Sequence, residues 1–134
     1  MEEKIKMDVK GWLILKGIDS KGNEMILYND HNTLTGDAKE ILTYILAGES
    51  WGLNKIKVLK NNVELASNTN LSHVFPTTDS VQFSCMFSET DFNDTLDELQ
   101  LISQSGKIFS KVSSLNVFKD NTVKLMVTWK LTIN

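Results

Sequence analysis

Apolar side chains recur at every second position through the C-terminal half of the chain, and this pattern predicts β-strands. In the last segment six of them keep this spacing: Val123, Leu125, Val127, Trp129, Leu131 and Ile133. Successive side chains of a strand point to opposite faces of a sheet, so these six would share one face. We therefore expect this strand to be central to the core, and a chain that ends at Asp120 to be unfolded.

Shorter alternating runs extend the pattern over residues 54–134. The clearest of them spans residues 81–87, where Val, Phe, Cys and Phe keep one phase. Asn61-Asn62 is typical of a type I′ hairpin turn, since both of its central residues need positive φ. Near the N-terminus, the runs 12–15 and 25–28 flank a Gly-containing turn and predict a further hairpin. Residues 66–80 and the acidic segment 89–97 are predicted to be loops.

One helix is predicted, over residues 35–47. Five apolar residues follow helical spacing and would lie on one face: Ala38, Ile41, Leu42, Ile45 and Leu46. Thr35 is the expected N-cap, Asp37 suits the helix dipole, and Gly48 is placed to end the helix. So short a helix is not stable alone in water, and it must pack on a sheet or close the end of a barrel.

These elements predict a single mainly-β domain over residues 1–134, with an N-terminal arm at 1–10. Seven or eight short antiparallel strands with one inserted amphipathic helix indicate a β-sandwich or jelly-roll-like fold. Cys85 keeps the phase of the apolar positions around it, and we interpret it as a small buried hydrophobic residue.

Charge and hydropathy narrow the classes of partner. The 134 residues carry a net charge of −3, and all 14 basic residues are lysines spread along the chain. Nucleic-acid binding usually requires clustered Lys and Arg, so no direct nucleic-acid partner is expected. No apolar run is long enough to cross a bilayer and no signal peptide is visible, so we expect no membrane partner and synthesis in the cytoplasm.

Residues with catalytic or metal-binding potential are few. His31 and His73 fall in predicted loops without a patterned Ser or Cys partner, and Cys and His are too sparse for zinc. We therefore predict no catalytic residues, no cofactor and no metal. The acidic loop could bind calcium, but its spacing is not that of an EF-hand, and a solvated loop is the preferred interpretation. Candidate contact residues for a partner protein are Trp51, Phe92, Asp91 and Asp94.

The order of several segments carries a resemblance. An Asn-Thr-Leu-Thr-Gly entry leads into a helix ending Leu-Ala-Gly and then a Lys-Ile-Lys-Val strand. Leu-Asp-Glu-Leu-Gln-Leu, Gly-Lys-Ile-Phe-Ser-Lys-Val and a terminal Val-Thr-Trp-Lys-Leu strand follow. Over residues 32–133 the chain resembles small structural proteins of tailed bacteriophages, the tail, tail-fibre- or baseplate-associated group. The resemblance implies a non-enzymatic building block present in several copies.

We accordingly expect a virion structural protein of the tail, baseplate or neck, assembled in the host cytoplasm. Its expected partners are other virion proteins and further copies of itself, through sheet edges, long loops and the N-terminal arm. Two alternatives stay open: a capsid decoration or fibre-attachment protein, and a carbohydrate- or receptor-binding module. The last would need exposed aromatic residues beside Asn, Asp and Gln on one face.

Overall fold

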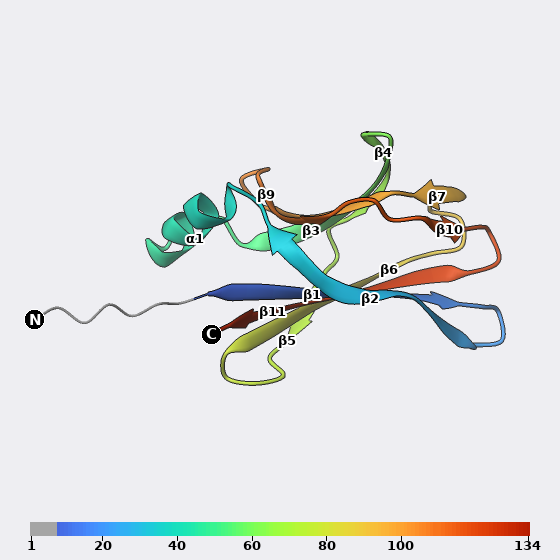
Figure 1. Ribbon diagram of the computed structural model, residues 1–134, viewed down its shortest axis with the longest axis horizontal. Helices are drawn as coiled ribbons and strands as arrows, with labels where there is room; N and C mark the ends of the chain where they lie inside the picture. Colours follow the sequence, from blue (N-terminus) through green and yellow to red (C-terminus); the bar gives the residue numbers. More distant parts are fainter. Residues whose placement is uncertain (1–7) are drawn as a thin grey trace, which may run out of the picture.

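The computed structural model describes residues 8–134, which form a β-sandwich-like fold with one short helix (Figure 1). The first seven residues of the predicted N-terminal arm lie outside the described residues. The elements, in chain order, are β1 (Val9–Ile18), β2 (Glu24–Leu34), α1 (Ala38–Leu46), β3 (Leu53–Lys60), β4 (Val63–Asn68), β5 (Ser72–Val74), β6 (Ser80–Phe87), β7 (Asp94–Leu96), β8 (Glu98–Ser103), β9 (Ile108–Val112), β10 (Val117–Lys119) and β11 (Lys124–Ile133).

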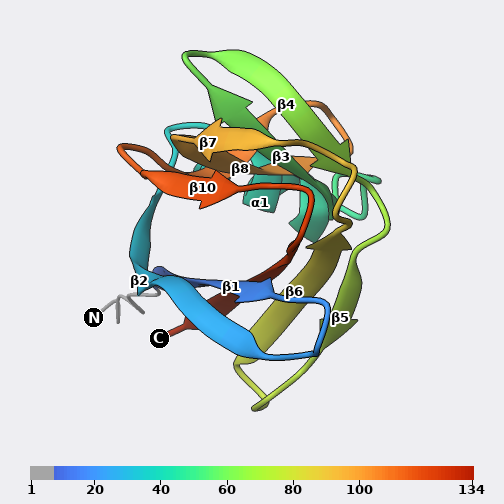
Figure 2. The same ribbon diagram turned by 90° about the vertical axis from the view of Figure 1, so that its right-hand side faces the viewer.

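Nine strands form one antiparallel sheet that folds over on itself into two layers, in the order β4-β3-β8-β9-β2-β1-β11-β6-β5. The layers face each other in Figure 2. Strand β2 joins them, because it pairs with β1 along most of its length and with β9 at Thr33 and Leu34. On the opposite side Asn68 Nδ2 donates to the Met86 carbonyl oxygen at 3.0 Å. The free edges are thus β4 and β5, and β7 with β10 forms a separate small sheet.

The core lies between the two layers and is centred on β11. This strand sits between β1 and β6, as the predicted central position requires. Leu125, Val127, Trp129 and Leu131 are buried against residues of the other layer. Only these four of the six predicted side chains are buried. Val123 precedes the strand, and Ile133 lies at the end of the sandwich, where it stays exposed.

The predicted turns are confirmed, but two segments predicted as loops contain strands. Asn61 and Asn62 have φ values of 50° and 64°, as a type I′ turn requires. Strand β2 continues to Leu34, so His31 lies on a strand and not in a loop. His73 lies on edge strand β5, inside the segment predicted as an exposed loop. The acidic segment contains β7, which pairs with β10.

Helix α1 is shorter than predicted and only half covered. Asp37 is its N-cap, not Thr35, whose hydroxyl instead donates to the carbonyl oxygens of Ile108 and Phe109. Gly48 follows the helix with φ of 84° and its N–H donates to the Ile45 carbonyl, as predicted. The first turn is buried, whereas Leu46 at the end of the apolar stripe is 86% exposed. The helix packs on the sandwich through Ala38, Ile41 and the half-buried Leu42, and its last turn is exposed.

Cys85 is buried in the core on β6, as its phase in the sequence predicts. Burial raises the pKa of its thiol from 9.0 to about 12. Because the thiolate is the reactive form, we expect Ellman's reagent at pH 8 to leave native Cys85 unmodified and to react once denaturant unfolds the chain. The pKa of the thiol is higher in the folded chain than in the unfolded chain. Its contribution to the free energy of unfolding is therefore fully present below pH 9 and is lost as the pH rises from 9 towards 12. Rapid modification of the native chain at pH 8 would contradict this placement.

Candidate functional site

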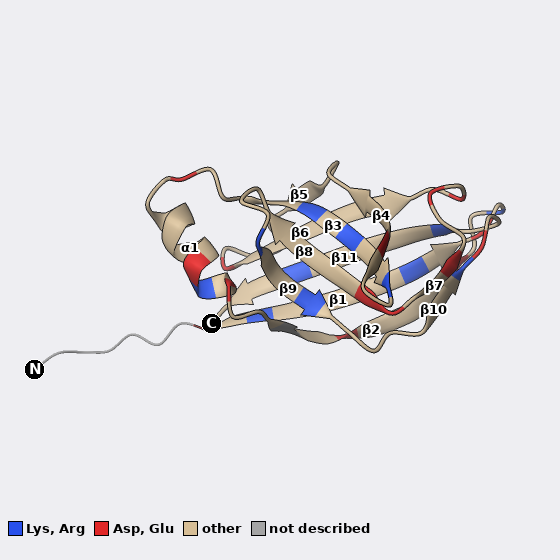
Figure 3. Ribbon diagram, turned by 90° about the horizontal axis from the view of Figure 1, so that it is seen from above, with Lys and Arg blue, Asp and Glu red and all other residues tan. Residues whose placement is uncertain are grey.

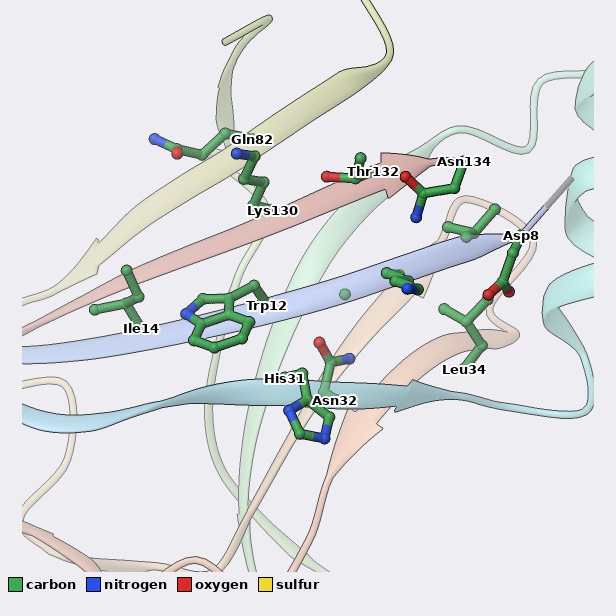
Figure 4. Close-up of a pocket in the computed structure, with 13 residues that line it drawn as sticks. Asp8, Trp12, Ile14, His31, Asn32, Leu34, Gln82, Lys130, Thr132 and Asn134 are labelled. Carbon is green, nitrogen blue, oxygen red and sulfur yellow. The ribbon is translucent and has the colours of Figure 1, made fainter. Parts of the chain in front are cut away.

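Two of the surface hollows are candidate binding sites, and they lie on different parts of the sandwich. The first, which we call the Trp12 pocket, is an open depression of about 1160 Å³ on the outer face of the β1–β11–β6 layer (Figure 4). The second, the end groove, has about 390 Å³ and lies between α1 and the end of β11.

The Trp12 pocket is built around a row of four side chains that crosses four neighbouring strands. Strand register places Trp12 opposite His31 on β2 and opposite Lys130 on β11, and Lys130 opposite Gln82 on β6. Figure 4 shows these four side chains side by side on the sheet. Neighbouring strands lie about 4.8 Å apart, so the row extends over roughly 14 Å. It combines an aromatic ring, an ammonium, an amide and an imidazole in one line.

The Trp12 indole is held in place while its ring stays accessible. Its Nε1 donates to Asn29 Oδ1 at 2.6 Å, and the His31 ring lies 6.0 Å from it, centroid to centroid, at a tilt of 43°. The side chain is still 43% exposed. A large apolar ring that is both anchored and open to solvent is a preformed contact surface, because little rotamer freedom remains to be lost on binding.

The floor of the Trp12 pocket is fixed by Asn32. Its Oδ1 accepts a hydrogen bond from Trp129 Nε1 at 3.2 Å, and its Nδ2 donates to Ser110 Oγ. Gly11 makes room for it, since any Cβ at position 11 would overlap the Asn32 amide. The amide of Asn32 is therefore occupied by structural bonds, and the polar groups left for a ligand are those of Lys10, Lys130, Gln82 and their neighbours.

The Trp12 pocket contains more lysine than carboxylate side chains, although the whole chain has a net negative charge. Within residues 8–134, neither Lys10 nor Lys130 has an ion-pair or hydrogen-bonding partner for its ammonium. Asp30 Oδ1 lies 2.8 Å from His31 Nδ1 and Asp8 lies at the far rim, so carboxylates are confined to the margins. Figure 3 shows the same division in the molecule, with lysines along the strands and many carboxylates near the β7–β10 end.

The end groove is apolar and lies open because the helix is only half covered. Leu42 and Ile45 of α1 form one wall, and Phe75, Phe83 and Ile133 lie across from them. Phe75 is 71% exposed, and Tyr44 and Leu46 extend the apolar surface beyond the groove. Figure 1 shows α1 at one end of the long axis of the molecule.

The structure separates the four residues predicted as partner contacts. Trp51 is half-buried, and its ring stacks on Tyr44 with the centroids 4.0 Å apart. Phe92 lies in the core, in edge contact with Phe87 at 5.9 Å, so its ring is not available to a partner. Asp91 is exposed and accepts from the Ser88 N–H. Asp94 pairs with Lys60 at 2.7 Å, and this hydrogen bond lowers the pKa of the carboxyl. Trp51 thus lies next to the end groove, whereas Phe92, Asp91 and Asp94 lie at the opposite end of the sandwich.

Sequence reasoning did not single out Trp12. Both phases of β1 contain apolar residues: Leu13 and Leu15 face the core, and Trp12 and Ile14 face outward. The usable signal was the pair Lys10 and Lys16, which share the phase of Trp12 and mark the outer face. The described residues include no group of three or more His, Cys, Asp and Glu side chains that could hold a metal ion. His31 and His73 lie on different strands and do not form a joint site.

Within residues 8–134 no helix is both long enough and apolar enough to cross a membrane. No family model, no curated protein and no solved structure matches this chain.

Proposed function

We propose that this chain is a non-enzymatic structural protein of a tailed-phage virion, which assembles with copies of itself and with other virion proteins through its α1 end. The end groove carries the proposal. Contiguous exposed apolar side chains mark interaction surfaces in soluble proteins, and here Ile45, Phe75 and Ile133 are exposed and line one groove. Leu46 follows Ile45 on α1 and is exposed as well. The resemblance to tail- or baseplate-associated proteins supports a place in the virion.

The sheet edges support assembly in a second way. Strand β5 is a free edge whose three residues are all exposed, and it leads directly into Phe75 of the end groove. A free edge offers unpaired backbone groups to a neighbouring chain. A neighbour seated on the α1 end could therefore cover the groove and the edge together.

Replacement of Leu46 by lysine is expected to weaken this assembly. Leu46 is the most exposed of the large apolar residues within 8–134, and a charge there would have to be desolvated in any contact. We expect light scattering to show that the purified wild-type chain forms an oligomer. For Leu46→Lys we expect the dissociation constant of that oligomer to be at least about tenfold higher.

Met25→Lys is the matched control, because Met25 is also an exposed apolar residue but lies at the opposite end, away from the groove. It should assemble like the wild type, and electron microscopy of the oligomer would show whether it is a ring. A chain that stays monomeric at every concentration and binds no phage particle component would refute the proposal.

The Trp12 pocket favours a second candidate function, a carbohydrate- or receptor-binding module. The pocket is lined by an exposed indole, by the neighbouring His31 and by the side-chain amides of Gln82 and Asn134. Sugars are commonly bound by an aromatic ring that covers their apolar face and by side-chain amides that bond their hydroxyls. The two candidates use different surfaces, so one chain could perform both functions.

A further inference from the structure

We propose that the Trp12 pocket binds an anionic saccharide, whose sugar ring lies on the Trp12 indole and whose carboxylate or phosphate lies against Lys130 and Lys10. This inference rests on the carbohydrate-binding function just described and adds the charge class of the ligand. It follows from the order of side chains across the sheet, from the state of the two lysines, and from the orientation of the indole.

The order of side chains suits an extended, hydroxylated ligand. Trp12 and Lys130 face each other across the β1–β11 pair, so a ring on the indole would bring its substituents within reach of the ammonium. Gln82 follows on the next strand, where its amide can both donate to and accept from hydroxyl groups. The row is longer than one sugar ring and would accommodate a short oligosaccharide.

The state of the lysines favours an anion over a neutral sugar. Lys16, on the same face of β1, pairs with Glu24 at 3.4 Å, whereas Lys10 and Lys130 have no such partner within residues 8–134. Two unpaired ammonium groups outnumber Asp8, the one carboxylate side chain among the residues that line the pocket, on a chain whose net charge is −3. A carboxylate or phosphate on the ligand would complete charge-assisted hydrogen bonds there, which are stronger than those to neutral hydroxyls.

The orientation of Trp12 explains why an aromatic contact and an ionic contact can occur together. The Asn29 bond uses the indole N–H, so the ring face is the part left to a ligand. The electron-rich face of an aromatic ring attracts the weakly positive C–H groups of a sugar. An acidic peptide would satisfy the lysines but would not need this ring, which is why we infer a saccharide.

The test uses the purified full chain and pairs of oligosaccharides that share a backbone and differ only in a carboxylate or a phosphate. We expect calorimetry to show binding of the anionic members and at least about tenfold weaker binding of their neutral counterparts. Lys130→Met should reduce affinity for the anionic members about tenfold and leave the neutral ones unchanged. Trp12→Ala should abolish both, and Trp12→Phe should retain part of the binding.

Lys55→Met is the matched control, because Lys55 is half-buried like Lys130 but lies on β3 in the other layer, away from the pocket. It should bind like the wild type, and circular dichroism should show every variant folded. Equal affinity for neutral and anionic members would overturn the charge class and leave carbohydrate binding in place. Binding to polyglutamate that survives Trp12→Ala would overturn the saccharide in favour of an acidic protein. No binding to any saccharide would overturn both this inference and the carbohydrate-binding function.

Discussion

A chain that ends at Asp120 is expected to lack stable tertiary structure. The truncation removes β11, the strand between β1 and β6, and with it four buried side chains. Burial of each such side chain contributes about 1.5–3 kcal/mol, so the four together account for roughly 6–12 kcal/mol. Typical domains are stable by only about 5–15 kcal/mol. Loss of β11 also leaves β5 and β6 without their bond to the rest of the sheet.

Circular dichroism with thermal melting measures this effect directly. The full chain should show a cooperative transition, and the fragment 1–120 should show none. A chain that ends at Ile133 is the control, since it lacks only Asn134, an exposed residue with backbone hydrogen bonds to Asp8. A cooperative melt of the 1–120 fragment would mean that the core does not depend on β11.

The strands of the core were predictable because their signal is strictly local. On β11 the buried and exposed phases differ in polarity at most positions, so the sequence alone places Val127 and Trp129 in the core. The turn at Asn61-Asn62 was equally accessible from the sequence, because its backbone conformation favours few residue types. The fold class follows from these local patterns together.

The Trp12 pocket and the end groove could not be predicted in the same way. Each exists because no other part of the described chain covers its apolar side chains, and local sequence patterns do not show this. The apolar stripe of α1 predicts a buried face, but only tertiary structure shows that Ile45 and Leu46 at its end stay exposed. From the sequence alone Trp12 fits a core position as well as an exposed one, and the register places it opposite Lys130 on the outer face. Phe92 shows the converse, because its acidic neighbours suggested an exposed loop and the ring is buried.

The burial of Lys119 was not indicated by any pattern in the sequence. It is the last residue of β10, its side chain is fully buried, and its Nζ lies 5.0 Å from the centroid of the Phe92 ring. The ammonium donates to the carbonyl oxygens of Phe92 at 2.8 Å, Glu89 at 3.0 Å and Asp120 at 3.1 Å. It therefore fixes the loop between β6 and β7 to the end of β10, as a single cation shared by three backbone acceptors.

Lys119→Met is expected to destabilise the domain by about 2–4 kcal/mol, because it keeps the apolar stem but leaves these acceptors without their donor. Urea unfolding followed by tryptophan fluorescence gives the change in the free energy of unfolding. Lys124→Met is the matched control: Lys124 is exposed and only 3.9 Å from Glu89, and loss of such a surface pair should cost less than about 1 kcal/mol. If both variants unfold at the wild-type urea concentration, the buried ammonium does not hold the loop. If only Lys119→Met lowers the free energy of unfolding, the conformation of the acidic segment 89–97 depends on this lysine. The buried ammonium then holds the carboxylates of that segment in place at the β7–β10 end.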